Sequence, residues 1–277
     1  MRTLIRSDIH LGLPEPFPGR LGRSPATLSP LLEAADRVVL NGDAADTQHP
    51  SHRAQGIELL EQLAALATRK GVDLIRISGN HDVEETALTH IELARGKILV
   101  THGHAFSASM LPWVPASGAM NRVFAEALGR NPPTVEGAVR AANDAALVQW
   151  SDERSVDEPT ALLAIGLRPT RVLSVLAWWR KYPRDAARFA QRYAPSAQFV
   201  VCGHSHRAGA WSIATDGGAR RWILNTGSFS FPSRPHAVIV TEEDGGAGTS
   251  LEMRRIVQRR GGYTLAEESR ASSWRIH

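Results

Sequence analysis

Five short apolar stretches, each followed by side chains that can bind a metal, constrain this chain more than any other feature. They cover residues 4–6, 37–40, 72–77, 97–100 and 198–202 and are rich in Val, Ile and Leu. Short apolar runs of this length are typical of strands that are buried on both faces, as in a parallel sheet. We therefore expect an α/β fold in which these runs are strands.

Polar side chains follow every one of these runs. They are Asp8 and His10, then Asp43, then Asn80, His81 and Asp82, then His102 and His104, and finally His204 and His206. The carboxyl ends of parallel strands lie along one sheet edge, where α/β proteins bind ligands, so these side chains should meet. Six of the chain's eleven histidines fall in these segments, which chance placement does not explain.

The spacing and chemistry of this set predict a metal centre. In Asp-x-His and His-x-His, alternate residues leaving a strand point the same way and can reach one ion. Aspartate, asparagine and histidine together form a mixed oxygen and nitrogen set, which suits Mn²⁺, Fe or Zn²⁺ better than a thiolate zinc site or an all-oxygen Ca²⁺ or Mg²⁺ cage. Seven ligands exceed the needs of one ion, whereas two ions that share a bridging carboxylate account for them.

The motifs Asp-x-His, Gly-Asp, Gly-Asn-His-Asp, His-Gly-His and Gly-His-x-His, in this order, resemble those of the calcineurin-like metallophosphoesterases. The resemblance covers residues 7–206 and the closing strands that follow. It implies a four-layer α/β/β/α metallophosphoesterase sandwich that holds two divalent ions, with Mn²⁺ expected first and Fe or Zn²⁺ as alternatives. Carried over by position, the ligands are Asp8, His10, Asp43 and His206 for one ion, and Asp43, Asn80, His102 and His204 for the other.

The resemblance also implies catalytic roles. His81 would protonate the leaving group or stabilise the transition state, and Asp82 would orient His81 by accepting its other ring N–H. Two further residues stay open. His104 is interpreted as a substrate contact or a support for the ligands, and Asp46 as either such a support or a helix cap.

The expected reaction is hydrolysis of a phosphate ester or pyrophosphate bond by a water that two metal ions activate, without a protein nucleophile. In pattern, the motifs and the segment 225–228 are closest to the branch of bacterial UDP-diacylglucosamine pyrophosphohydrolases, which typically carry Arg where this chain has His81. A small nucleotide- or lipid-linked phosphate is therefore the expected substrate. A metal-dependent nuclease remains the alternative, because a related branch shares these motifs and the pI is about 9.7. A non-catalytic scaffold on the same fold is the third hypothesis.

Along the chain, we expect one domain over residues 1–260, with a helical insertion at 105–195 that acts as a lid and a polar tail at 261–277. A helix is predicted over 54–70, ending at Gly71, and Ser29-Pro30 is interpreted as the start of another helix. Antiparallel strands are expected after residue 205. Their ranges are 210–213, 221–224, 237–241 and 251–257, with a hairpin loop at 242–249.

The insertion differs from the rest of the chain in charge. Residues 161–195 hold seven Arg or Lys and one acid, Asp185, together with Trp178 and Trp179. This mixture would suit an anionic phosphate joined to an apolar group, and it allows peripheral lipid contact. No apolar run approaches the ~20 residues of a membrane span. With no secretory signal pattern and Cys202 as the single cysteine, expected in the core, we expect a cytoplasmic protein.

Overall fold

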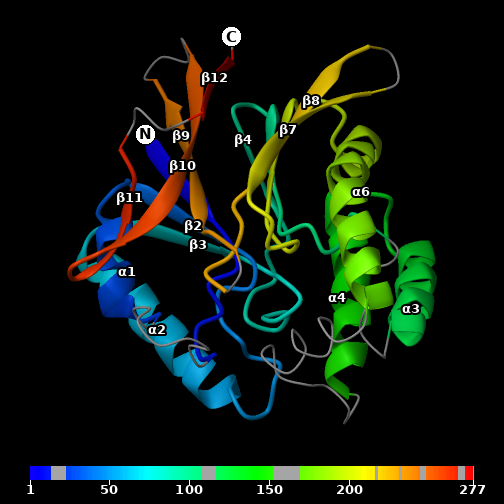
Figure 1. Cartoon of the computed structure of the whole chain (residues 1–277), viewed down its shortest axis with the longest axis horizontal. Helices are drawn as coiled ribbons and strands as arrows, with labels where there is room; N and C mark the ends of the chain where they lie inside the picture. The colour runs from blue at the N-terminus through cyan, green and yellow to red at the C-terminus, as the bar shows by residue number, and fades with distance from the viewer. Residues whose placement is uncertain are drawn as a thin grey trace.

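Two sheets packed face to face, with helices on both outer sides, give this protein four layers in the order α/β/β/α (Figure 1). The structure is a computed structural model and describes residues 1–13, 23–107, 117–151, 169–215, 218–230, 233–243, 248–267 and 272–276. The α/β sandwich expected from the sequence is confirmed.

The first sheet contains the first three predicted strands at its centre and edge. In spatial order it holds β11 (Gly262–Leu265), β10 (Thr249–Arg259), β9 (His236–Glu242), β1 (Arg2–Arg6), β2 (Arg37–Asn41) and β3 (Asp73–Ile77), and β12 (Ser272–Ile276) also pairs with β10. β1, β2 and β3 are parallel, whereas β9 runs antiparallel to β1.

The second sheet contains the other two predicted strands. Its order is β4 (Ile91–Leu93), β5 (Ile98–Val100), β6 (Phe199–Cys202), β8 (Arg220–Asn225) and β7 (Gly209–Ala214). β5, β6 and β8 are parallel. All five apolar runs are therefore strands, but they are divided between two sheets, so their ligand-bearing ends come from two neighbouring sheet edges.

Strand side chains alternate between two hydrophobic cores, which explains why consecutive positions in the runs are apolar. In β1, Ile5 lies in the core between the sheets, whereas Leu4 packs with the helices of the first layer. In β6, Val201 faces the same inter-sheet core and Val200 faces the helices of the fourth layer. Cys202 lies in this last core, where burial raises the pKa of its thiol to about 12, so the thiol stays protonated.

The first sheet is covered by α1 (Pro25–Leu32) and α2 (Arg53–Arg69). α2 ends as predicted, because Gly71 follows it with a φ of 67°. The prediction that Ser29-Pro30 begins a helix is wrong. Ser24 caps α1 in a capping box with Thr27, and Pro30 lies inside the helix. The chain contains two Ser-Pro pairs five residues apart, and both are equally good local start signals.

We expect Ser24→Ala to destabilise the protein by about 1 kcal/mol, because the side chain of Ser24 accepts the N–H of Thr27 at the helix start. Chemical unfolding followed by circular dichroism measures the change. Ser29→Ala is the matched control. The hydroxyl of Ser29 makes an exposed, long hydrogen bond of 3.4 Å to the carboxylate of Glu33 and does not cap the helix. Equal losses for the two variants would contradict the assignment of the cap.

The second sheet is covered by α3 (Ser117–Arg130), α4 (Val135–Ser151) and α6 (Pro169–Tyr193), which lie between β5 and β6 in the sequence. Small side chains on the inner faces of these helices, such as Ala142 of α4 and Ala186 of α6, are fully buried. Their small size lets the helices pack closely. In the described part of residues 105–195, all regular structure is helical.

The last residues differ from the polar tail that we expected, because β11 and β12 both pair with β10. Trp274 of β12 packs between the sheets, with its ring 5.2 Å from that of Trp222 in β8. Its neighbours Ser273 and Arg275 are exposed. Two inward side chains in five residues are too weak an alternation to identify a strand from sequence.

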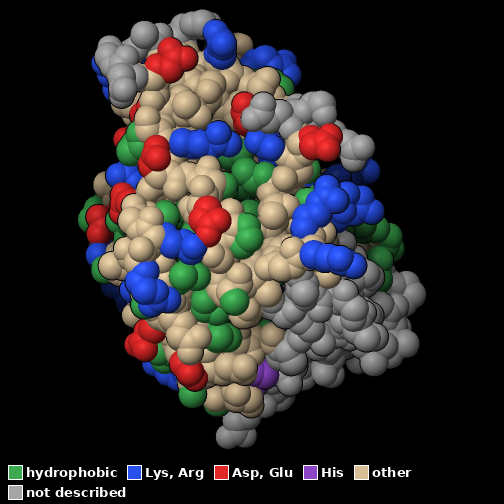
Figure 2. Space-filling view, turned by 90° about the vertical axis from the view of Figure 1, so that its left-hand side faces the viewer, with side chains coloured by type: hydrophobic (Ala, Val, Ile, Leu, Met, Phe, Trp, Pro, Cys, Tyr) green, Lys and Arg blue, Asp and Glu red, His purple; other side chains and the backbone are tan. Residues whose placement is uncertain are grey.

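On the face shown in Figure 2, Lys and Arg side chains are interspersed with Asp and Glu, so this face carries no field of one sign. Among the helices that the structure describes, none combines the length and apolar character needed to cross a membrane.

Candidate metal centre

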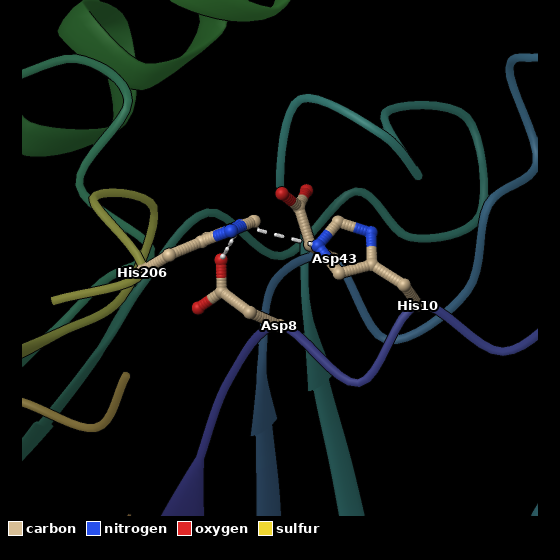
Figure 3. A group of neighbouring side chains, drawn as sticks. All are labelled: Asp8, His10, Asp43 and His206. Atoms are coloured by element: carbon tan, nitrogen blue, oxygen red, sulfur yellow. Dashed lines mark hydrogen bonds and ion pairs between the residues drawn. The ribbon is translucent and has the colours of Figure 1, made fainter. Parts of the chain in front are cut away.

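The loops that leave β1, β2 and β6 bring four of the predicted ligands together. The ligand-type atoms of Asp8, His10, Asp43 and His206 all lie within 4.8 Å of one another. His206 Nε2 is 3.1 Å from Asp8 Oδ1 and 3.3 Å from His10 Nε2. Figure 3 shows these side chains reaching one point from three separate segments.

A second group forms beside the first and shares one residue with it. Asp43, His102 and His204 likewise offer ligand atoms within 4.8 Å of one another. His102 Nε2 is 3.1 Å from Asp43 Oδ2, and Asn80 Oδ1 is 2.8 Å from His204 Nδ1. All seven predicted ligands therefore lie in two adjoining groups, and Asp43 belongs to both.

His81 forms a third group of ligand-type atoms with His10 and Asp46, and its ring lies 4.8 Å from that of His10. The carboxylate that faces it is Asp46, whose Oδ2 is 3.1 Å from His81 Nδ1 and 3.7 Å from His10 Nδ1. Asp46 is buried, and its pKa is lowered because the charges of His81 and His10 outweigh the effect of burial. Of its two predicted roles, the structure places it against these imidazoles.

Asp82 does not take the role that we expected for it. Its carboxylate accepts the backbone N–H groups of Asp43 at 3.1 Å, Ala44 at 2.7 Å and Gly79 at 2.7 Å. Burial and the charge of Asp43 raise the pKa of Asp82 to about 6. Asp82 therefore ties the loop after β3 to the loop after β2, and Asp46 replaces it as the partner of His81. The sequence predicts only Asp82 for this role, because the path of the loop after β2, which brings Asp46 to His81, cannot be read from the sequence.

The backbone of the ligands is in an uncommon conformation. Seven non-glycine residues in the described ranges have positive φ, and five of these are predicted ligands. They are Asp8 (53°), His10 (54°), Asp43 (51°), His204 (63°) and His206 (56°). Such angles cost roughly 1–3 kcal/mol each for residues other than glycine and concentrate at functional sites.

Close approach between the loops requires glycine at two positions. A Cβ at Gly79 would overlap the carboxylate of Asp43, and a Cβ at Gly203 would overlap that of Asp8. The sequence therefore brings the ligand loops into contact by placing glycine directly before Asn80 and His204.

The centre is buried, and the opposite charges within it shift the pKa values of its carboxylates and imidazoles. Burial favours the neutral carboxyl, but the imidazoles of His102 and His206 outweigh it and lower the pKa of Asp8 to about 2. The same balance, dominated by His102 and His81, lowers the pKa of Asp43. Burial opposes a charge on His102 as well, yet Asp43 raises its pKa to about 9. Without a metal, a proton on His102 thus supplies part of the positive charge that the carboxylates require.

The orientation of His102 tests whether a cation fits. Its Nδ1 lies 2.9 Å from the carbonyl of Asn41, which can only accept, so Nδ1 carries a proton. Its buried Nε2 makes no hydrogen bond although it faces Asp43 Oδ2 at 3.1 Å. Once Nε2 has lost its proton, as metal binding requires, its lone pair faces the carboxylate of Asp43, an arrangement that a cation shared between the two atoms stabilises. The residues present therefore fit divalent metal ions.

His104 is connected to the helices of the fourth layer. Its Nε2 lies 2.7 Å from Asn143 Oδ1 of α4, and Asn143 Nδ2 donates to Ser78 Oγ at 3.3 Å. Burial, reinforced by His102, lowers the pKa of His104 to about 3, so the ring is neutral. Asn143 had no signal in the sequence, since it lies in an Ala-rich helix far from every motif.

Two members of the centre reach solvent. The side chains of His206 and His81 are 28% and 14% exposed, whereas those of His10 and His102 are 0% exposed. The open side of the centre is therefore the side that holds His206 and His81.

Comparison with known proteins agrees with the fold. A sequence model of the Calcineurin-like phosphoesterase superfamily domain matches residues 1–245. The chain belongs to the calcineurin-like phosphoesterase superfamily.

Solved structures with a similar arrangement include Vps29 proteins. A double mutant of Vps29 from Entamoeba histolytica is 14% identical with a TM-score of 0.43, and the match covers 100% of this chain and 98% of that chain. Wild-type Vps29 from the same organism, complexed with Zn²⁺, is 14% identical with a TM-score of 0.42 and the same coverage. Vps29 from Chaetomium thermophilum is 14% identical with a TM-score of 0.40 and covers 99% and 95%. No curated protein matched the chain.

Proposed function

We propose that this protein is a dinuclear metal-dependent phosphoesterase that hydrolyses a phosphate ester or pyrophosphate bond of a small nucleotide- or lipid-linked substrate. The observation that carries this proposal is the position of Asp43, whose carboxylate belongs to both groups of ligand-type atoms. A shared carboxylate is the expected feature of a two-ion site.

In this proposal, seven residues would be metal ligands and His81 would be the proton donor. Asp8, His10 and His206 would hold one ion and Asn80, His102 and His204 the other, with Asp43 between them. When bound, such ions neutralise phosphoryl oxygens and lower the pKa of an attacking water. His81 would donate a proton from Nε2 to the leaving oxygen, because Asp46 faces its Nδ1.

The surroundings of the centre support a substrate with an apolar or aromatic part. Buried Trp178 places α6 beside the centre, because its ring lies 5.7 Å from that of His204, centroid to centroid. Earlier in the same helix, Leu173 and Leu176 are 65% and 45% exposed. The mixed charges of the face in Figure 2 offer no support for a long nucleic-acid groove there.

An activity panel with Mn²⁺ tests the proposal. We expect cleavage of aryl phosphodiesters and of a nucleoside diphosphate-sugar, with slower cleavage of single-stranded DNA. Removal of metal with a chelator should lower the rate by a factor of about 10³ or more, since metal ions supply several kcal/mol of transition-state stabilisation. Added Mn²⁺ should restore it.

Two results would assign the protein differently. Single-stranded DNA as the fastest substrate would identify a nuclease. Two bound equivalents of Mn²⁺ without hydrolysis of any substrate in the panel would favour a scaffold that keeps the ligands but not the reaction.

A further inference from the structure

Three aromatic side chains of α6 contact the segment between β6 and β7 that carries His204 and His206. We call Trp178, Trp179 and Tyr182 the aromatic clasp. Tyr182 Oη donates to the carbonyl of Gly203 at 2.9 Å, and Trp179 Nε1 donates to the carbonyl of Ser205 at 2.9 Å. Trp178 meets the imidazole of His204 in an edge-on contact.

The Tyr182 hydroxyl also reaches the other ligand loop. It lies 3.4 Å from the carbonyl of Gly103, the residue after His102. Gly103 has a φ of 107°, and a Cβ at this position would overlap the hydroxyl of Tyr182. One buried hydroxyl thus lies between the two loops that supply the histidines of the second group.

These contacts act on a segment whose conformation needs support. His204 and His206 have φ values of 63° and 56°. Positive φ persists at such residues only when the surrounding structure fixes it. From the inner side, Asp8 accepts the N–H of His204 at 3.1 Å, and Asn225 donates to Ser205 Oγ at 3.0 Å. The aromatic clasp supplies the matching contacts from the helical layer.

We infer that the aromatic clasp is a positioning element of the metal centre. It holds the Gly-His-Ser-His segment in the conformation in which His204 and His206 can act as ligands. The helices between β5 and β6 thereby contribute to metal affinity as well as covering the second sheet. This inference rests on the ligand roles in the proposed function.

The variant Tyr182→Phe tests the inference, because it keeps the buried ring and removes only the hydroxyl. We expect one of the two Mn²⁺ equivalents to bind about tenfold more weakly, the usual cost of losing a group that supports a metal ligand. Isothermal titration with Mn²⁺ measures this. Hydrogen exchange of the metal-free protein should be faster at residues 203–206 than in wild type. Trp179→Phe, which removes the indole N–H, should act in the same direction.

Tyr193→Phe is the matched control, since it removes a hydroxyl from the same helix at a residue that contacts Phe189 rather than the ligand loops. Unchanged Mn²⁺ affinity and unchanged exchange at 203–206 in Tyr182→Phe would overturn the inference. Failure of the proposed function is a separate result, because it would appear as wild-type protein that binds Mn²⁺ but hydrolyses nothing.

Discussion

Asp43→Ala should abolish hydrolysis, with a rate loss of about 10³-fold or more. The reason is geometric: Asp43 is the residue common to the two groups of proposed ligands, so its removal should affect both proposed ions together. It also frees His102 Nε2, which faces Asp43 Oδ2 at 3.1 Å. A loss of several kcal/mol of electrostatic stabilisation corresponds to this factor. Steady-state kinetics on an aryl phosphodiester, together with elemental analysis, provide the measurement.

Asp144→Ala is the control for this variant. Asp144 lies exposed on α4, so the substitution makes the same chemical change outside the centre. We expect near wild-type rates and metal content for it. Full activity in Asp43→Ala, with two ions still bound, would show that Asp43 does not bridge them.

His81→Ala should lower turnover by a factor of about 10²–10⁴, the usual contribution of a general acid. The loss should depend on the leaving group. An alkyl leaving group needs a proton as it departs, whereas a nitrophenolate does not, so the loss should be large for the first and small for the second. Metal content should stay at the wild-type value, because the seven proposed ligands are unchanged. Since His81 also forms a group of ligand-type atoms with His10 and Asp46, a lower metal content would show that His81 binds an ion itself.

The variant Asp46→Asn extends this test, because Asp46 is the carboxylate that faces His81 Nδ1. Asp46→Asn should also lower turnover more for an alkyl leaving group than for a nitrophenolate, but the loss should be smaller than in His81→Ala. His90→Ala is the control, since His90 contacts Thr89 away from the centre. If turnover of His81→Ala depended on the leaving group in the same way as turnover of wild type, His81 would not be the proton donor.

Much of the fold and the composition of the site could be predicted from the sequence, because both depend on local pattern. Each apolar run is long enough to form one buried strand, and each ends in side chains whose chemistry is recognisable without coordinates. The structure brings Asp8, His10, Asp43, Asn80, His102, His204 and His206 together, as expected. Their roles as metal ligands remain a proposal that the experiments above examine.

What could not be predicted depends on the path of the chain in space. The two Ser-Pro pairs give equal local signals, and the structure caps α1 at Ser24, with Pro30 inside the helix. Asp46 and Asp82 are both near His81 in the fold, and only the loop after β2 decides which carboxylate meets the ring. The contribution of Asn143 could not be predicted either, because its partner His104 lies in a distant loop.

The positive φ angles of five ligands have a consequence for the protein as a whole. Their conformational cost opposes folding in the absence of ions, whereas a ligand that binds only the native state stabilises it by mass action. Folding and metal loading are therefore thermodynamically linked. With the proposed ions bound only to the native state, the free energy of unfolding of this chain should rise with their free concentration.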